Sequence, residues 1–353
     1  MSKNILIQLQ PIDYYFFGGE ETFNSGAKGI TNYYVKSNKL PQQTGLLGCI
    51  RHALFEGGYP IGDSFDGKNQ NYGFISTISP LFLRTKEGEI LLPAPSNINH
   101  LEATIDVSLT TGGKSFFNGI WKDNNIDASG YEAKEGNGNY WINISTGKLV
   151  SPNNLFSSKD HIGINKGKQL QNKAAEGGFY KQEFITLQEG LSFAVVAQLD
   201  EKVEINNLPP QLTFGGEKRT FNLTYTNTEM SWVLLKHMAF DVFRIHSGST
   251  CCLMLLTDTF IEKIDVLYQT IDYGIINETP FRNIITPKTV TNFSRLSRQL
   301  KEDSLLKTIK GTYLFKKGSV FYFNREKATE IKELISNPIF ESVGYNHYFI
   351  FNN

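Results

Sequence analysis

The last third of the sequence carries the pattern that most restricts the possible folds. An apolar run, "CLMLLTDTF" from Cys252, is followed by a connection and then by "GTYLF" and "SVFYFN", which predict a hairpin across the turn "KKG". The amphipathic stretch "EKATEIKELIS" predicts a helix, and "YNHYFIFN" predicts a final strand. This order of strand, connection, hairpin, helix and strand is close to that of a ferredoxin-like domain.

The first 228 residues follow a similar order with longer insertions. Strands are predicted at "NILIQLQPID", at two segments around the turn "KEG", and at "FYKQEFITL", "LSFAVVAQLD" and "RTFNLTYT". A helix is predicted over 41–58, and no second helix is evident before the last of these strands. Residues 112–178 are rich in Gly, Asn and Lys, and we interpret them as an insertion that carries contacts and not as a core element.

These patterns predict an α+β chain made of two ferredoxin-like (RRM-like) domains. A chain of 353 residues exceeds what one hydrophobic core usually organises. We place the first domain at 1–228, with inserted loops at about 112–178, and the second at 229–353.

The charge distribution bears on the choice of partner. Lys and Arg together number 35, as do Asp and Glu, so the chain lacks the overall basic bias of an autonomous nucleic-acid-binding protein. Residues 282–317 nevertheless hold nine bases and two acids, and 159–181 hold five lysines and two acids. The balance suits a subunit that contacts an anion with one surface and proteins with others; the alternative is an ordinary solvated face.

No motif in the sequence specifies catalysis or a cofactor. There is no GxSxG, HExxH, Asp-x-Asp or P-loop pattern, and the three cysteines have no zinc-site spacing. We therefore predict no catalytic residue, metal or cofactor. Metal-independent RNA cleavage by a single histidine stays open as an alternative, with His52 or His161 as acid or base. Because no signal peptide or membrane-spanning run is evident, we expect a cytoplasmic protein without membrane contact.

Glycine-flanked basic or polar stretches recur where predicted elements meet. They are "PQQTGLLGCIRH", "HIGINKGKQ", "FGGEKR" and "LFKKGS". Backbone N–H groups at glycine turns, together with Lys or Arg, form phosphate sites. The recurrence favours contact with a single-stranded polyanion whose bases stack on neighbouring Tyr and Phe. For "LTFGGEKRTFNL", a hairpin turn with surface charge is the competing interpretation.

Several of these segments, taken in order, resemble a known family. The series "QTGLLGCIRHALF", "GEILLPAPS", "GGFYKQEFITL", "LTFGGEKRTF" and "YLFKKGSVFYF" is similar to the third-subunit family of the Cmr complex, within the RAMP superfamily of type III-B CRISPR effectors. The resemblance implies two ferredoxin-like domains and a non-catalytic subunit that binds the 5′ handle of the crRNA. It also implies docking against the large polymerase-like subunit and the backbone RAMP subunit. The alternatives are a metal-independent RAMP endoribonuclease that processes precursor crRNA, and a β-rich protein–protein adaptor without RNA.

The resemblance also implies which residues contact the RNA. They are Gln43, Thr44, Gly45 and Arg51; Asn165, Lys166 and Lys168; Gly215, Gly216, Lys218 and Arg219; and Lys316, Lys317 and Ser319. In this interpretation the two glycines of "FGGEKR" let the RNA backbone approach, and the two bases neutralise it. Family members often carry a glycine-rich loop before the last strand, whereas this chain has only Gly344 there.

Overall fold

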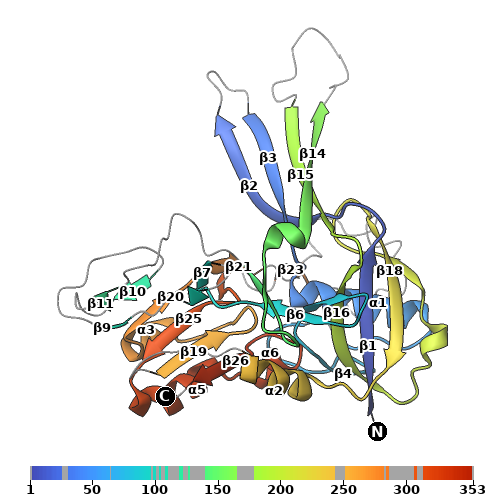
Figure 1. Cartoon of the computed structure of the whole chain (residues 1–353). Coiled ribbons are helices and arrows are strands. Elements are labelled where there is room, and N and C mark those ends of the chain that lie inside the picture. Colours follow the sequence, from blue (N-terminus) through green and yellow to red (C-terminus); the bar gives the residue numbers. More distant parts are fainter. Residues whose placement is uncertain are drawn as a thin grey trace.

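The chain forms two β-sheets that pack face to face, with helices on their outer faces and a narrow β-arm that projects from the body (Figure 1). The structure is a computed structural model. It describes residues 2–25, 31–63, 65–96, 98–100, 103–104, 108–109, 119–121, 126–127, 140–164, 179–242, 251–281, 284–285, 306–307 and 313–351. The architecture is mixed α/β, and none of the helices described here has the length and apolar content needed to cross a membrane.

The N-terminal sheet has nine strands in the order β13-β12-β6-β5-β16-β1-β18-β17, with β4 also paired to β16. Its strands are β1 (Ser2–Pro11), β4 (Ile75–Ile78), β5 (Phe82–Thr85), β6 (Ile90–Pro93), β12 (Trp141–Asn143), β13 (Leu149–Val150), β16 (Leu191–Asp200), β17 (Gln211–Thr213) and β18 (Thr220–Asn227). The predicted strand pair around "KEG" is confirmed, since Leu83 pairs with Leu91 across an antiparallel ladder.

Both faces of this sheet are covered, which explains the unbroken apolar run of β16. Phe193, Val195 and Ala197 pack toward helix α1 (Gln43–Glu56), and the intervening Ala194 and Val196 pack toward the second sheet. A strand buried on both faces reads as a continuous hydrophobic run and not as an alternating one. The α1 helix covers the sheet with apolar side chains at helical spacing, namely Leu46, Leu47, Ile50, Ala53 and Leu54.

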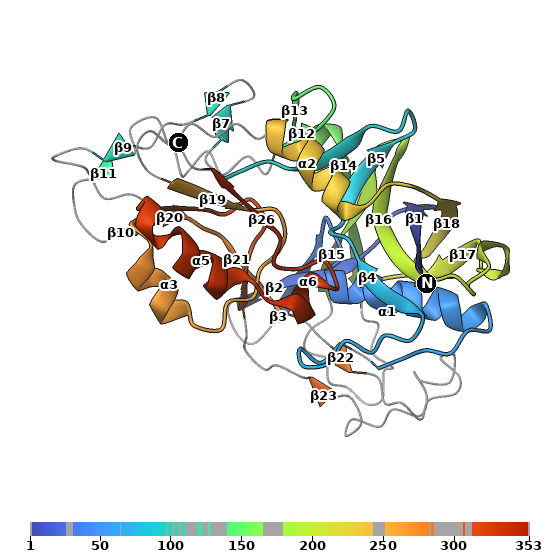
Figure 2. The same cartoon turned by 90° about the horizontal axis from the view of Figure 1, so that it is seen from below.

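The C-terminal sheet has five strands in the order β10-β20-β25-β19-β26. Its strands are β10 (Gly119–Trp121), β19 (Cys251–Leu255), β20 (Tyr273–Ile275), β25 (Val320–Phe323) and β26 (Tyr348–Phe351). Helices α3 (Ile264–Thr270) and α5 (Ala328–Ile335) cover its outer face, as Figure 2 shows from below. The other helices of this half are α2 (Trp232–Val242) and the short α6 (Pro338–Glu341). Its inner face, with Cys252, Met254 and Tyr322, packs against the N-terminal sheet.

The remaining short elements connect these layers. They are β7 (Ile98–His100), β8 (Ala103–Thr104), β9 (Ser108–Leu109), β11 (Ile126–Asp127), β21 (Glu278–Pro280), β22 (Ile284–Ile285), β23 (Leu306–Lys307), β24 (Tyr313–Phe315), and the 3-10 turns η2 (Pro152–Asn154), η3 (Ile205–Asn207) and η5 (Arg325–Lys327).

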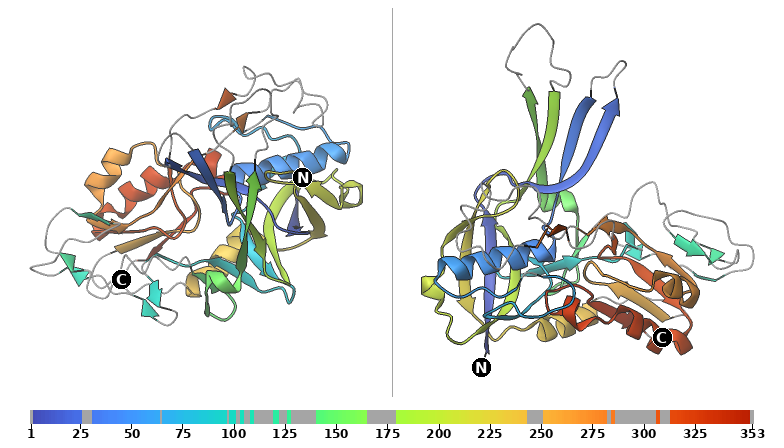
Figure 3. Two further views of the ribbon diagram at one scale, coloured as in Figure 1. Left: turned by 90° about the horizontal axis from the view of Figure 1, so that it is seen from above. Right: turned by 180° about the vertical axis from the view of Figure 1, so that it is seen from behind.

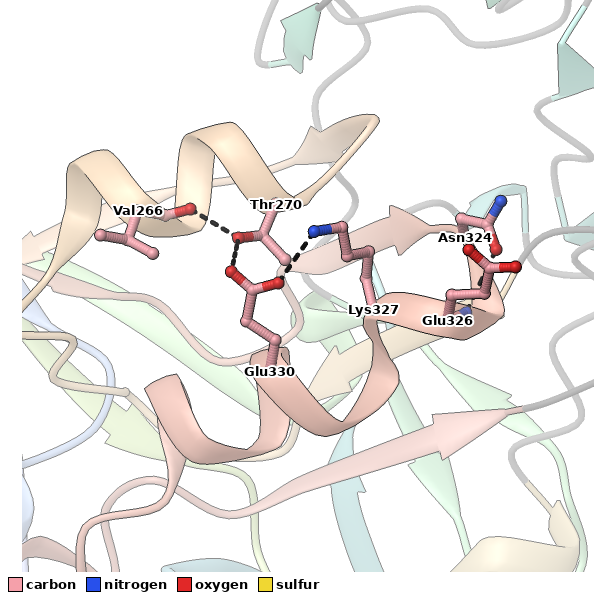
Figure 4. A network of polar contacts seen from close by, with 6 residues as sticks. All are labelled: Val266, Thr270, Asn324, Glu326, Lys327 and Glu330. Atoms are coloured by element: carbon pink, nitrogen blue, oxygen red, sulfur yellow. Dashed lines mark hydrogen bonds and ion pairs between the residues drawn. The ribbon is translucent and has the colours of Figure 1, made fainter.

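A polar network joins the two helices on the outer face (Figure 4). The Thr270 hydroxyl at the end of α3 lies 2.7 Å from the carbonyl oxygen of Val266 and 3.0 Å from Oε1 of Glu330 in α5. The other oxygen of Glu330 accepts a hydrogen bond from Lys327 Nζ at 3.0 Å. Glu330, which is partly exposed, therefore links the buried Thr270 of α3 to the start of α5.

Two sequence predictions for the fold are wrong. The segments "GTYLF" and "SVFYFN" do not form a hairpin: β24 pairs with β21, whereas β25 lies between β20 and β19. The turn between β24 and β25 is bonded to the end of β19: Leu255 N donates to Ser319 O, and Gly318 N donates to Leu255 O. The prediction that residues 112–178 contribute no core element is also wrong. Strand β12 belongs to the N-terminal sheet, and its Trp141 is part of the hydrophobic core.

A partly buried histidine joins α2 to the beginning of β26. Trp232 Nε1 donates to His347 Nδ1 at 3.0 Å, so the imidazole is neutral with its proton on Nε2, which faces the Glu341 carbonyl oxygen at 3.3 Å. Burial lowers the pKa of His347 to about 3, and the charge of Lys236 acts in the same direction. The folded imidazole therefore binds no second proton at pH values where the unfolded imidazole does.

We expect this histidine to make the stability of the fold sensitive to mild acid. The unfolded imidazole has a pKa of about 6.5, so the free energy of unfolding should fall below that pH with a slope of at most about 1.4 kcal/mol per unit. Denaturant titrations between pH 7.5 and 5 should show a shallower pH dependence for His347→Asn. His237→Asn, which changes an exposed histidine of α2, should keep the parent slope. Equal slopes for all three proteins would contradict the assignment.

Candidate functional site

The arm is a four-stranded sheet that rises from the N-terminal half (Figure 1; Figure 3, right). Its strands, in the order β14-β15-β3-β2, are β2 (Phe17–Ser25), β3 (Thr31–Asn38), β14 (Phe156–Ile164) and β15 (Phe179–Leu187). Tyr15 bridges to Ile185 at its base through two backbone hydrogen bonds of 2.7 and 3.0 Å. These bonds fix the foot of the arm against the body.

Two adjoining cavities lie at the foot of the arm, and we call them together the basic cleft. The larger has a volume of about 290 Å³, and its lining comes from the end of β3, from β6 and β12 of the N-terminal sheet, and from the C-terminal half. The smaller has a volume of about 210 Å³. They share Ser37, Asn38, Gln42, Thr279 and Lys316. The cleft therefore forms only when both halves of the chain come together.

Cations outnumber acids in the lining of the basic cleft. Its lysines are Lys36, Lys39, Lys316 and Lys317, and its acids are Asp258 and Glu278. Partial burial lowers the pKa of Lys39, and the nearby charge of Lys316 lowers it further. A bound anion would relieve the repulsion between these two ammonium groups.

The turn that carries Lys316 and Lys317 is built by local hydrogen bonds. Ser319 is fully buried, and its hydroxyl donates to Lys316 O at 2.7 Å and accepts from Asn277 N at 3.2 Å. Asp258 Oδ1 accepts from Lys317 N at 3.0 Å. Of the three residues predicted here, the two lysines line the cleft, whereas Ser319 shapes the turn that presents them.

The four predicted residues at the start of α1 are engaged within the protein. Gln43 Nε2 donates to Ser79 O and Val343 O at 2.9 and 3.0 Å, and Arg51 Nη2 donates to Gly62 O at 2.6 Å. Thr44 N donates to the Tyr345 hydroxyl at 3.2 Å. The nearest side chain to Gly45, apart from its chain neighbours, is Phe214. Burial of Gln43 and Arg51 therefore favours structural roles for these side chains.

The glycine pair of "FGGEKR" also has an internal explanation. Gly215 has φ of +82°, and a Cβ there would lie 2.6 Å from the carbonyl oxygen of Phe16. Gly216 N donates to the same oxygen at 2.8 Å. The backbone that approaches these glycines is therefore that of Phe16. Lys218 is exposed in a left-handed conformation, with φ of +51°, and the Arg219 guanidinium lies 4.6 Å above the Phe184 ring, where a cation–π contact holds it.

Gly215→Ala should therefore lower stability without altering RNA affinity. We expect a loss of about 2 kcal/mol in the free energy of unfolding, from strain at positive φ and the clash with Phe16. Gly190→Ala is a matched control, because its φ is +81° and its added Cβ would meet only the flexible Lys86 side chain. Weaker RNA binding by the folded variant, measured below its unfolding transition, would show instead that Gly215 contacts RNA.

The other predicted positions divide between described and undescribed parts of the chain. Asn165, Lys166 and Lys168 lie outside the described residues. His52 Nε2 lies 3.3 Å from Glu56 Oε1 on α1. The His161 ring of β14 and the Phe184 ring are nearly perpendicular, with their centroids 6.0 Å apart. Within the described ranges, no three His, Cys, Asp or Glu side chains are grouped as a metal site would require.

Sequence reasoning missed Lys36 and Lys39, which contribute half of the lysines in the cleft. They stand in "VKSNKLPQ", at the junction of a strand and the first helix. This stretch has a basic and polar character but no glycine, so a search for glycine turns passes over it.

Comparison with known proteins gives a family match. The family model described as CRISPR-associated protein (Cas_Cmr3) matches residues 7–115 and 129–353. The search of curated protein sequences found no match.

Two solved structures are similar to nearly the whole chain. A chain of the cryo-EM structure of the type III-B Cmr-beta bound to cognate target RNA has a TM-score of 0.53 at 14% identity, with coverage of 98% of this chain and 96% of that one. A chain of the same complex with cognate target RNA and AMPPnP, in state 1, has a TM-score of 0.48 at the same identity and coverage. At this identity the first likeness indicates a shared fold.

Proposed function

Because the chain belongs to the CRISPR-associated Cas_Cmr3 family, and is thus a component of a type III-B Cmr effector, we propose that it is a non-catalytic subunit that binds the 5′ handle of the crRNA in the basic cleft. The observation that carries the proposal is the convergence of lysines from both halves of the chain at the foot of the arm. Lysines of this kind neutralise backbone phosphates, the main source of affinity for RNA. Tyr140, which is partly exposed, lies in the same lining, and aromatic side chains on which bases stack are common in proteins that bind single strands.

We further propose that the two sheets are two ferredoxin-like units, with residues 1–228 and 229–353 as the domains. The order β26-β19-β25-β20, with α3 after β19 and α5 after β25, is that of a complete ferredoxin-like βαββαβ unit. The order β18-β1-β16-β5 is equivalent, with α1 after β1 and with η3 where the second helix would stand. Strands from the predicted insertion enlarge both sheets: β10 joins the second, and β12 and β13 join the first.

Docking onto the large polymerase-like subunit and the backbone RAMP subunit is the second part of the proposed function. Helix α2 supports it, because it presents apolar side chains outward as well as inward. Val233, Leu234, Met238 and Phe240 are 44 to 64% exposed, whereas Leu235 and Ala239 are buried. A helix that is apolar around most of its circumference is normally covered.

Leu234→Asp combined with Met238→Asp is therefore expected to weaken association with partner subunits by at least about tenfold, since each new carboxylate would be buried in an apolar interface without a partner. The association is measured as the amount of partner subunits that co-purify with the tagged chain from cells that express the complex. The matched control is Ile12→Asp, which changes another exposed apolar residue. Normal assembly of the α2 double variant would remove α2 from the docking proposal.

Lys316→Gln tests the RNA-binding part. The purified chain is titrated with labelled crRNA, and the variant should bind about five- to tenfold more weakly with an unchanged melting temperature. Lys202→Gln, at an exposed turn that does not line the cleft, should bind like the parent. Equal affinity for the parent and both variants would overturn the assignment of the cleft.

A further inference from the structure

The two cavities of the basic cleft have different chemistry. The larger has ring side chains in its lining: Pro41, Pro93, Pro95, Tyr140, Trp141, Pro152 and Phe156. The described residues that line the smaller cavity include no aromatic side chain and one proline, and its polar groups include Lys36, Lys316, Asn38 and Gln42 together with the carboxylate of Glu278. Lys316 belongs to both linings. A ligand with an anionic part and an adjacent flat apolar part matches this division.

The size of the larger cavity limits what can enter it. A volume of about 290 Å³ lies at the lower end of the range seen for small-molecule sites. It suits one nucleotide and not a stacked pair. With the phosphate near Lys316, the base would have to leave the stack to enter.

Tyr140 is the ring best placed to stack on such a base. Its side chain is partly exposed, whereas Trp141 and Phe156 are 4 and 5% exposed. Its backbone is held in place, since Ala94 N donates to Tyr140 O at 2.8 Å and the next residue, Trp141, pairs with Pro93. Lys39 Nζ lies 5.7 Å from the centre of the Phe156 ring, so a cation adjoins the apolar wall.

Asp258 is the only acid among the described residues that line the larger cavity. A carboxylate has about four acceptor sites, and Asp258 Oδ1 uses one to accept from Lys317 N. The remaining acceptor sites of Asp258 would favour a base that bears an exocyclic amino group, because such a group donates hydrogen bonds. Asp and Glu accept from cytosine N4 in the same way.

We propose that the larger cavity is a specificity pocket for a single unstacked nucleobase that bears an exocyclic amino group. The inference rests on the proposed function, because it assigns this base to the RNA strand whose phosphates the lysines contact. Tyr140 stacks on the base, Asp258 accepts from its amino group, and Lys316 contacts its phosphate. Guide binding is then selective at one handle position and tolerant at its neighbours.

The test is a scan of crRNAs that each carry one abasic site in the handle, titrated against the parent chain, Tyr140→Ala, Asp258→Asn and Lys316→Gln. One abasic position should lower the affinity of the parent by about tenfold, the loss of one base–aromatic stack. Tyr140→Ala should weaken binding of the intact guide by a similar factor and have no further effect on the guide that is abasic at that position. Asp258→Asn keeps an acceptor for Lys317 N but replaces the second oxygen with a donor, so it should favour a carbonyl-bearing base there.

Each outcome separates this inference from the proposed function. Equal affinity for all abasic guides, with Lys316→Gln still weakening every one of them, would overturn the pocket and leave the cleft as a phosphate site. No effect of Lys316→Gln on any guide would overturn the proposed function itself. If Tyr140→Ala melts at a lower temperature than the parent, the base preference of Asp258→Asn decides: an unchanged preference overturns the pocket.

Discussion

Gly344→Ala is expected to lower the free energy of unfolding by about 3 kcal/mol, through strain at positive φ and overpacking of a closed site. Gly344 has φ of +87°, and an added Cβ would collide with Gln43 Nε2 and lie 2.7 Å from Ser79 O. The same Nε2 donates to Ser79 O and Val343 O, so the collision would break the contact between α1 and the C-terminal half. Chemical denaturation of the parent and the variant measures the loss.

Gly58→Ala is the matched control for this prediction. Gly58 has φ of +84°, and nothing lies within 4 Å of an added Cβ, so the variant reports the conformational strain alone, about 1 kcal/mol. A Gly344 variant that loses no more stability than the control would show that the junction adapts to the extra methyl group. Gly344 would then have no special role in joining the halves.

Lys39→Glu combined with Lys316→Glu is expected to reduce crRNA affinity by at least about 100-fold at low salt. Each substitution replaces a favourable charge with a repulsive one in a partly enclosed site, where screening is weaker than at the surface. Loss of two phosphate contacts to a single strand should also reduce the slope of log K against log salt concentration by about 1.4. Titrations at several salt concentrations with the purified chain give both quantities.

The control for this charge reversal is Lys86→Glu combined with Lys202→Glu. Both lysines are exposed, and neither lines the cleft, so the net charge changes equally without touching the site. A control that loses affinity as strongly as the cleft variant would mean that the overall charge, and not the cleft, determines binding.

Local patterns predicted helices α1 and α5 and strands such as β1, β16, β18, β19 and β26, because each depends on residues close together in the sequence. Helices α2 and α3 and the arm strands β2, β3 and β14 were not predicted. The apolar spacing of α1 and α5 and the alternation within β1 are of this kind. The partners of β24 and β25 lie outside the local segment: β24 pairs with β21, and β25 pairs with β20 and β19. The hairpin prediction failed for that reason.

The candidate site was only partly predictable for a related reason. Lys316 and Lys317 stood out as charges beside a glycine turn, and both line the cleft. Gly215 and Gly216 showed the same pattern, yet the feature that demands glycine there is the Phe16 backbone. Lys39 and Asp258 line the same cavity although more than 200 residues separate them in the sequence, an arrangement that only the folded chain establishes.

The most direct test of the basic cleft is photo-crosslinking of the assembled effector loaded with crRNA that carries a crosslinkable base at successive handle positions, with the attached peptides identified by mass spectrometry. We predict that the dominant crosslinks fall on the segments around Lys39, Tyr140 and Lys316. Handle crosslinks confined to other surfaces of this chain, or to other subunits, would contradict the account.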